Sequence, residues 1–439
     1  MTKPLFAISG VQATRSGYGE MSRDVINAII DMDEFDIKII SLPWGACPMN
    51  ALNPDNPKDK AILDRTVPQP VQLPRQPEIY MHIGIPNEAQ AAGKFNILYT
   101  AGIETTMVSK EWLEGCNRMD LILTISEHSK RIFQETVIQE KDQQGNIIRE
   151  IKLEKPIEVL SCAVDTNIFR KIASLDVPAS IKDVMMTVKE DFNFLFVGHW
   201  LKGNIGEDRK NVGMLIKVFC ETFKNKGSNN RPGLILKTSG AGFSIMDRDE
   251  ILMKIRSVQS SCGKNPPNVY LLHGELTKEE MNGLYNHLKV KAMVNFTKGE
   301  GFNISPLEFT QSHKPIIISG WSGHLDFLNK DEALLIGGEL KPVDASSVWD
   351  GVIIKESSWF NIDLNQAAGA MHHVHKNYDK FLDNAKKLGR RNRENFSYDK
   401  LKEHTAEILH TRVPRFAMPV ALKLPQLKKI EAPKEVETV

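Results

Sequence analysis

The sequence lacks the features of a secreted, membrane-spanning or cysteine-stabilised protein. Its five cysteines are scattered without a Cys-x-x-Cys pair, which argues against a disulfide framework and against a cysteine-rich zinc site. No stretch comes near the roughly 18 consecutive apolar residues of a membrane-spanning helix, and the first residues enter a strand-like run without the apolar region of a signal peptide. These absences predict a cytoplasmic protein whose cysteines serve as small apolar fillers.

The sequence also lacks an excess of charge of either sign. The chain carries 56 Lys and Arg against 55 Asp and Glu, so its formal net charge is +1. The whole molecule therefore has no strong attraction for nucleic acid or anionic lipid, and any such affinity requires a local patch. With 41% hydrophobic and 25% charged residues, the composition is that of a soluble globular protein. The length of 439 residues predicts two domains, each of about 150 to 200 residues.

Short apolar runs alternate with longer helical patterns over most of the chain. Runs that are buried on both faces and separated by helices are typical of parallel sheets built from βαβ units. Six runs in each half predict two Rossmann-like α/β domains in series. The predicted strands are 5–9, 37–42, 79–83, 96–100, 121–125 and 157–161 in the first half, and 194–197, 234–237, 269–272, 292–296, 315–319 and 333–336 in the second.

The predicted domain organisation follows from this rhythm and from where it breaks. We assign the first domain to 1–165, an irregular linker to 166–190, the second domain to 191–395, and a helix returning towards the first domain, followed by a tail, to 396–439. The segment 43–77 carries eight prolines and is interpreted as a long surface loop. The segment 139–155, with Gln-Gln-Gly-Asn between polar flanks, predicts an inserted β-hairpin.

The first candidate motif is the glycine-containing turn TRSGYGEMS, from Thr14 to Ser22. Gly17 and Gly19 would let the backbone come close to a ligand, and the helix that follows favours anions at its N-terminus. As a dinucleotide fingerprint the motif is incomplete, because Ser22 replaces the third glycine and no acidic residue ends the next predicted strand. A plain turn between strand and helix explains the same residues.

The second candidate motif is GEGFNISPLEF, from Gly299 to Phe309. Ser305 is a natural N-cap and Pro306 fits the first helical position. Ser305 and Glu308 also have the spacing of a capping box, which gives Glu308 a purely structural explanation. Glu300 has no such explanation, because it precedes the helix in a glycine-flanked loop at the carboxyl edge of a parallel sheet, where open α/β sheets bind ligands.

This segment, with seven residues between its two glutamates, resembles the signature of glycosyltransferase family 4. Five further passages resemble that family in the same order, namely 97–133, 157–169, 198–219, 278–296 and 312–328. The likeness runs from about Ser9 to Phe396 and is strongest in the second half. It implies the GT-B fold, in which two Rossmann-like domains with parallel sheets face a central cleft. It also implies metal-independent, retaining transfer of a sugar from a nucleotide-sugar, with a UDP-sugar as the expected donor.

The resemblance implies roles for four charged residues in the second half. In the family, the first glutamate contacts hydroxyls of the transferred sugar and the second binds the nucleotide ribose, and Glu300 and Glu308 stand in those places. Arg209 and Lys210 occupy the matching basic positions, where they would neutralise the diphosphate leaving group. A solvated pair at a helix start is the alternative, although cations in the first turn oppose the helix dipole. His199 stands where the family often has an arginine.

The remaining candidate residues are backbone groups and first-domain side chains. Amides of the loop and helix N-terminus after Glu300 are expected to cradle the diphosphate; these residues are Gly301, Phe302, Asn303, Ile304 and Ser305. His82 and Glu104 lie at or near the ends of first-domain strands and are expected to face the cleft, where they would contact the sugar or the acceptor. For His82 a structural role is the alternative.

The sequence leaves the acceptor open. The long polar insertions at 43–77 and 139–155 are similar to those of glycosyltransferases from large bacteriophages. Some of those enzymes modify hydroxymethylated pyrimidines in DNA. The segment 386–393 has five basic residues in eight positions, enough for several phosphate contacts, although a basic face near a helix C-terminus explains it as well. The interpretation leans to duplex DNA, with a glycan, lipid-linked or on a surface polysaccharide, as the alternative.

Two functions other than glycosyl transfer also agree with parts of the sequence. Paired Rossmann-like domains are found in nicotinamide-dependent oxidoreductases, although the incomplete glycine fingerprint counts against that class. An inactive nucleotide-sugar-binding module is the other alternative, and the intact charged residues argue against it.

Overall fold

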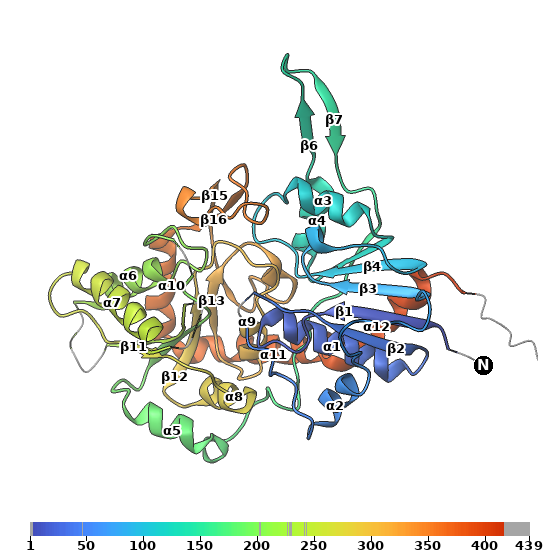
Figure 1. Cartoon of the computed structure of the whole chain (residues 1–439). Helices are drawn as coiled ribbons and strands as arrows, with labels where there is room; N and C mark the ends of the chain where they lie inside the picture. The colour runs from blue at the N-terminus through green and yellow to red at the C-terminus, as the bar shows by residue number, and fades with distance from the viewer. Residues whose placement is uncertain are drawn as a thin grey trace, which may run out of the picture.

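The structure is a computed structural model, and it describes residues 3–416 except 46, 202, 226, 228–230, 241 and 243. The chain forms two α/β halves that lie side by side (Figure 1). Each half is built on a 6-stranded sheet, and every pairing within these two sheets is parallel. The predicted fold class is therefore confirmed, and each predicted strand is present within a few residues of its expected bounds.

The first sheet has the strand order β2-β1-β3-β4-β5-β8. Its strands are β1 (Leu5–Gly10), β2 (Asp36–Ser41), β3 (Ile79–Ile83), β4 (Phe95–Thr100), β5 (Leu121–Thr124) and β8 (Ile157–Val159). The helices of this half are α1 (Gly17–Met32), α2 (Pro57–Leu63), α3 (Lys110–Asn117) and α4 (Glu127–Glu135). Most of the strand residues are buried, because helices cover both faces of a parallel sheet.

The second sheet has the strand order β11-β10-β9-β12-β13-β14, which is the 3-2-1-4-5-6 order of a Rossmann fold. Its strands are β9 (Asn193–Val197), β10 (Gly233–Lys237), β11 (Val269–Leu272), β12 (Val290–Asn295), β13 (Ile316–Ser319) and β14 (Leu334–Ile336). Its helices are α6 (Val212–Phe223), α7 (Ile245–Ser261), α8 (Lys278–Asn286), α9 (Ile304–Thr310), α10 (Leu364–Lys376) and α11 (Leu382–Asn395). An antiparallel pair, β15 (Gly338–Pro342) and β16 (Ser358–Ile362), adjoins this half.

The chain crosses between the halves twice, and the two crossings lie together. The amide of Val164 donates to the carbonyl of Phe396 at 2.8 Å. The second crossing leads into α12 (Tyr398–Arg412), which packs on α1 of the first half. Residues 417–439, which include most of the predicted tail, lie outside the described residues.

Two segments predicted to be irregular contain helices. Within 166–190 the chain forms α5 (Ala179–Met186), because Ile181 and Met185 are buried on one helix face. Within 43–77 it forms α2, which Asn56 caps at its N-terminus and whose Ile62 is fully buried. Both helices are short, so their apolar periodicity is too brief to stand out in the sequence.

The predicted hairpin is confirmed as β6 (Ile138–Lys141) and β7 (Ile147–Ile151), an antiparallel pair that projects from the first half (Figure 1).

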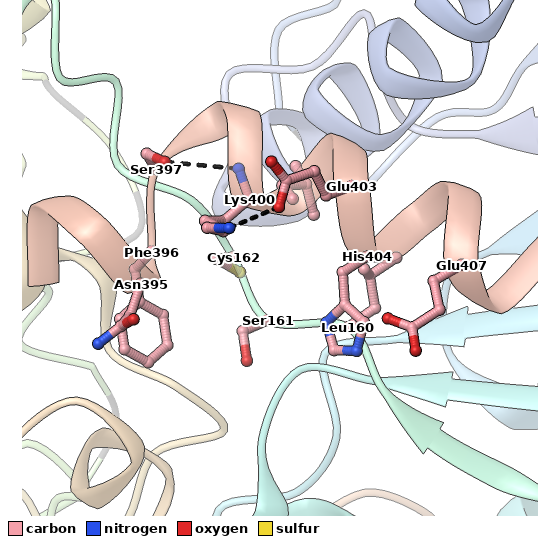
Figure 2. Close-up of a pocket in the computed structure, with 11 residues that line it drawn as sticks. Leu160, Ser161, Cys162, Asn395, Phe396, Ser397, Lys400, Glu403, His404 and Glu407 are labelled. Carbon is pink, nitrogen blue, oxygen red and sulfur yellow. Dashed lines mark hydrogen bonds and ion pairs between the residues drawn. The ribbon is translucent and has the colours of Figure 1, made fainter.

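A cavity of about 310 Å³ lies where the two crossings meet α12. Figure 2 shows Ser161 and Cys162 of the first crossing opposite Lys400 and His404 of the helix. None of the residues that line this cavity belongs to the two sequence motifs. The cavity therefore does not include the predicted donor-site residues, although its lining residue Phe396 packs on Phe302.

Candidate functional site

The loops that follow β4 and β12 meet at the junction of the two halves. A Cβ added to Gly299 would lie 1.8 Å from the carbonyl oxygen of Glu104, and one added to Gly301 would lie 2.2 Å from that of Ala101. Real Cβ atoms essentially never come within 3.0 Å of another heavy atom. The glycines on either side of Glu300 are therefore what allows the second half to approach the first at this point.

Glu300 lies at the centre of a buried charge cluster. Its Oε2 accepts a hydrogen bond from Arg209 at 2.9 Å, and its Oε1 accepts one from Lys210 at 2.6 Å and one from Thr297 at 2.7 Å. Burial by itself would raise the pKa of the Glu300 carboxyl, but the charges of Lys210 and Arg209 outweigh it and hold that pKa at about 2. Glu300 is therefore ionised at neutral pH although only 6% of its surface is exposed.

Arg209 and Lys210 lie in a loop, not in the first turn of a helix as predicted. The helix α6 begins at Val212, and Asn211, with φ at 57°, turns the chain into it. A left-handed residue at this point ends the loop before the helix starts, so the helix-dipole argument does not apply to the pair. Burial lowers the pKa of Lys210 more than the nearby Glu300 carboxylate raises it.

Glu104 adds a charge from the first half. Its Oε1 lies 3.6 Å from Nη2 of Arg209. Burial lowers the pKa of the Arg209 guanidinium, but Glu300 and Glu104 more than offset this and raise it. One arginine therefore pairs with carboxylates from both halves. The structure brings together Glu300, Arg209, Lys210 and Glu104, four of the five predicted catalytic residues.

The helix after Glu300 does not begin as predicted. Asn303, with φ at 74°, is the N-cap of α9 and makes no side-chain capping bond. Ser305 and Pro306 therefore lie inside the first turn, and the predicted capping box is wrong. Glu308 instead points inward, where its Oε2 accepts a hydrogen bond from Tyr285 at 3.1 Å. Glu308 is therefore not explained by a capping role at the start of this helix.

Glu308 faces charged groups from both halves. Glu20, in the first turn of α1, forms an ion pair with Lys278 at the start of α8. Burial and the nearby Glu20 carboxylate raise the pKa of Glu308, and Lys278 only partly offsets them. Burial and Glu20 also raise the pKa of Asp24, one turn further along α1. Three carboxyls thus surround one ammonium group when the halves lie together.

No protein-family model and no curated protein sequence matches this chain. Solved structures match it over nearly its whole length. HepE from Anabaena, in complex with UDP and glucose, aligns with a TM-score of 0.61 at 12% identity, covering 93% of this chain and 100% of that one. Sucrose-phosphate synthase from Thermosynechococcus elongatus aligns with 0.58 at 10% identity, covering 93% and 98%. A UDP-forming α,α-trehalose-phosphate synthase from Burkholderia vietnamiensis aligns with 0.57 at 10% identity, covering 94% and 98%.

These neighbours are glycosyltransferases of the GT-B type. The chain has the GT-B fold. In this GT-B fold the Glu300 cluster lies where the loops of the two sheets meet, with contributions from both halves.

Two general properties of the described part of this GT-B chain bear on its surroundings. None of its helices combines the length and apolarity needed to cross a bilayer. No three of its His, Cys, Asp and Glu side chains gather in an arrangement that could hold a metal ion. Metal independence stays a prediction.

The two predicted histidines differ in exposure, since His82 is buried and His199 is exposed, but the pKa of each is lowered. Nδ1 of His82 lies 3.0 Å from Ser9 Oγ, and burial lowers the His82 pKa to about 4. Within the described residues no hydrogen bond or ion pair joins His82 to Glu300. Nδ1 of His199 lies 3.1 Å from Ser239 Oγ, and partial desolvation of the ring followed by the charge of Lys210 lowers the His199 pKa. His199 therefore does not replace the positive charge of the family's arginine.

Some of the predicted donor-loop residues are needed for packing of the GT-B fold, and others are free to contact a ligand. Gly19 is needed for packing, because its Cβ would lie 2.2 Å from the carbonyl oxygen of Thr14. Gly17 has no atom within 4 Å of that position, so it is free to face a ligand. Phe302 is buried and packs on Phe327, so only its backbone is available for the predicted phosphate contact.

Sequence reasoning missed several residues that complete the site. Thr297 and Ser322 hold Glu300, the first through the carboxylate and the second through the Glu300 amide at 3.1 Å. Thr297 stands three residues before Glu300 on the same strand-end loop, and that position was the available signal. No sequence pattern indicated the Glu20–Lys278 pair, because this contact depends on how the two halves lie together.

The charges around Glu308 predict a pH dependence of stability. Because the Glu308 pKa is raised to about 8, the folded chain keeps a proton there at pH values at which the unfolded chain has lost it. The free energy of unfolding therefore falls as the pH rises from about 5 to about 8. Glu308→Gln removes this contribution, so the variant should gain on the order of 4 kcal/mol relative to the native chain over that window.

Urea unfolding of both proteins at the two ends of the window measures this gain. Gln keeps an acceptor for the Tyr285 hydroxyl, so the variant should fold. Glu339→Gln, which changes a glutamate with 71% of its side chain exposed, is the matched control and should follow the native curve. An identical pH dependence for Glu308→Gln and the native chain would exclude the raised pKa.

Proposed function

We propose that this protein is a retaining glycosyltransferase that moves a sugar from a nucleotide-sugar, a UDP-sugar, to an acceptor hydroxyl. The observation that carries the proposal is the ionised Glu300 carboxylate held between Arg209 and Lys210 where the two halves meet. A diphosphate leaving group needs positive charge already in place, and this pair supplies it. HepE, which has the same fold, binds UDP and glucose, and this supports a uridine donor.

The proposed mechanism begins with an exchange of partners. Before the donor binds, the Glu300 carboxylate neutralises Arg209 and Lys210. The donor diphosphate takes over these two cations, which leaves the carboxylate free to accept hydrogen bonds from hydroxyls of the sugar. As the bond to the leaving phosphate breaks, the growing negative charge is stabilised by the same two cations. The leaving phosphate oxygen helps to take the proton of the acceptor hydroxyl.

The remaining residues bind the ends of the donor and the acceptor. Glu308, beside Tyr285, binds the ribose hydroxyls. Backbone amides from Gly301 to Ser305 contact the diphosphate, and Gly17 lets the first half approach it. Glu104 orients Arg209 from the first half and faces the incoming acceptor, and His82 supports that side of the site. No metal takes part in this proposal.

The proposed acceptor is a hydroxymethylated pyrimidine in duplex DNA, with α11 as the contact. Lys386, Lys387 and Arg390 are exposed on this helix and available to phosphates. Arg391 is instead engaged within the protein, where it donates to the Phe327 carbonyl at 3.0 Å and pairs with Glu332 at 2.9 Å.

Arg393 also makes an internal bond, to Gln311 at 3.3 Å. Because Arg391 and Arg393 both have partners inside the protein, fewer cations remain for DNA than the sequence suggests. This observation favours a glycan as the second candidate acceptor.

Nucleotide release from uridine, guanosine and adenosine diphosphate sugars, each with and without hydroxymethylated duplex DNA, tests the proposal. We expect one uridine donor to release UDP, and release to rise at least about tenfold when the correct acceptor is present, because the acceptor completes the reacting geometry. Release that ignores DNA would exclude the DNA acceptor and direct the search to glycans. No release from any donor would contradict the proposed function, and binding of a nicotinamide cofactor would then be measured directly.

A further inference from the structure

Lys298 is a buried cation directly before the Gly-Glu-Gly motif. Its side chain is 1% exposed. Its Nζ donates to the carbonyl of Gly206 at 2.7 Å and to Oδ2 of Asp344 at 2.8 Å, and it lies 4.5 Å from the centroid of the Trp359 ring. Removing an ammonium group from water is costly unless hydrogen bonds and opposite charge replace the lost hydration. Lys298 has both kinds of partner, and they come from different segments.

The partners of Lys298 belong to the segments that carry the charge cluster. Gly206 lies in the loop that leads to Arg209, three residues before it. The backbone makes the same connection, because the amide of Lys298 donates to the Arg209 carbonyl at 2.8 Å. On its other side, the carbonyl of Lys298 accepts a hydrogen bond from the amide of Phe360 at 2.8 Å. Residue 298 therefore joins the Arg209 loop to β16, two positions before Glu300.

The segment 343–357, which we call the strap, extends this connection to the first half. Asp344, the partner of Lys298, is its second residue. The strap bonds the Arg209 loop again, since the hydroxyl of Ser347 donates to the Glu207 carbonyl at 2.7 Å. In the middle of the strap, the Ser109 hydroxyl of the first half donates to the carbonyl of Gly351 at 3.0 Å. Directly after the strap, the amide of Thr106 donates to the Ser358 carbonyl at 2.9 Å.

We propose that Lys298 is a positioning residue, which holds the Arg209–Lys210 loop at its working distance from Glu300 and ties that distance to the docked strap. From two positions before Glu300, the ammonium group contacts both the Arg209 loop, at Gly206, and the strap, at Asp344. A residue needed only to fill this space would not require a charge. This inference rests on the proposed function, because the distance matters for stabilising a leaving diphosphate.

The test uses Lys298→Met in the full chain, with UDP-glucose as the donor. Methionine keeps the length of the side chain and removes the charge and both hydrogen bonds. We expect kcat for UDP release to fall by about thirtyfold with the donor KM changed by less than about threefold, because a shift of the cations by about 1 Å lowers transition-state stabilisation more than donor binding. Hydrogen exchange of the amides in 203–212 should accelerate. Lys298→Arg, which keeps charge and donors, should restore kcat to within about fivefold.

Lys341→Met is the matched control, because it makes the same substitution at a lysine of β15 that is 55% exposed and pairs with Glu339. It should change neither kcat nor exchange. A folded Lys298→Met protein with kcat within about twofold of the native chain and unchanged exchange would overturn the proposal, since about 1 Å of displacement should cost far more.

Two further results keep the test decisive. If Lys298→Met does not fold, Asp344→Asn decides, because it removes only the charge partner; we expect kcat to fall by about fivefold, and an unchanged kcat would overturn the proposal. If the native chain releases no UDP, the proposed function fails by itself. The exchange comparison between Lys298→Met and Lys341→Met then still tells whether Lys298 holds the Arg209 loop.

Discussion

Glu300→Gln is expected to lower turnover by about a hundredfold or more while the affinity for UDP rises. Both effects follow from the same contacts. In the native site Glu300 occupies Arg209 and Lys210 through bonds of 2.9 and 2.6 Å, so a diphosphate must displace it. Glutamine has nearly the same size but no charge, and it leaves the two cations free for the diphosphate. The sugar hydroxyls lose their charged acceptor, and this loss lowers the rate of the transfer step.

The two measurements are UDP affinity by calorimetry and the rate of UDP release at saturating donor. Opposite changes in affinity and rate distinguish this explanation from misfolding, which would lower both. Glu339→Gln on the exposed surface of β15 is the control and should alter neither quantity. Undiminished turnover in Glu300→Gln would exclude Glu300 from the reaction, and weaker UDP binding would exclude the exchange of partners.

The approach of Arg209 to Glu300 could be predicted from the sequence, although 91 positions separate them. Arg209 follows the first strand of the second sheet and Glu300 follows the fourth, and these strands, β9 and β12, are neighbours. In a parallel sheet with this order the carboxyl ends of neighbouring strands lie at one edge. Apolar periodicity located the strands, and the fold then brought the charged residues together.

The starts of α9 and α6 were less predictable. Ser305 has a better capping side chain than most residues, yet Asn303 begins α9, because its left-handed conformation turns the chain two residues earlier. Asn211 does the same before α6. Capping rules rank side chains but do not indicate which residue adopts a positive φ, and asparagine is among the few residue types that do so readily. Both errors therefore arose at asparagines.

Contacts between the halves could not be predicted at all. Glu104 and Arg209 meet at 3.6 Å, and Glu20 pairs with Lys278, but no sequence spacing connects residues of two separate sheets. These contacts depend on the docking of one half on the other, which an apolar cluster containing Ile8 and Val25 together with residues of α9 supports. What the sequence does contain is the pair of glycines around Glu300 that makes the docking possible.

Gly301→Ala is expected to separate the halves. A Cβ at this position would lie 2.2 Å from the carbonyl oxygen of Ala101, which is backbone at the end of β4 and has no rotamer with which to move away. The alanine can be accommodated only if the loops after β4 and β12 part. Since Glu104 would then leave Arg209, turnover should fall by about a hundredfold, and the radius of gyration should increase as in a hinge opening.

Small-angle scattering with and without UDP, together with UDP release, measures both effects. Gly369→Ala in α10, where no atom lies within 4 Å of the added Cβ, is the matched control, and it should be as compact and as active as the native chain. The variant separates two roles for the glycines of this motif. If Gly301→Ala remains compact but inactive, Gly301 acts through contact with the donor; if it opens and loses activity, docking of the halves assembles the site. Full activity in a compact Gly301→Ala protein would contradict both roles.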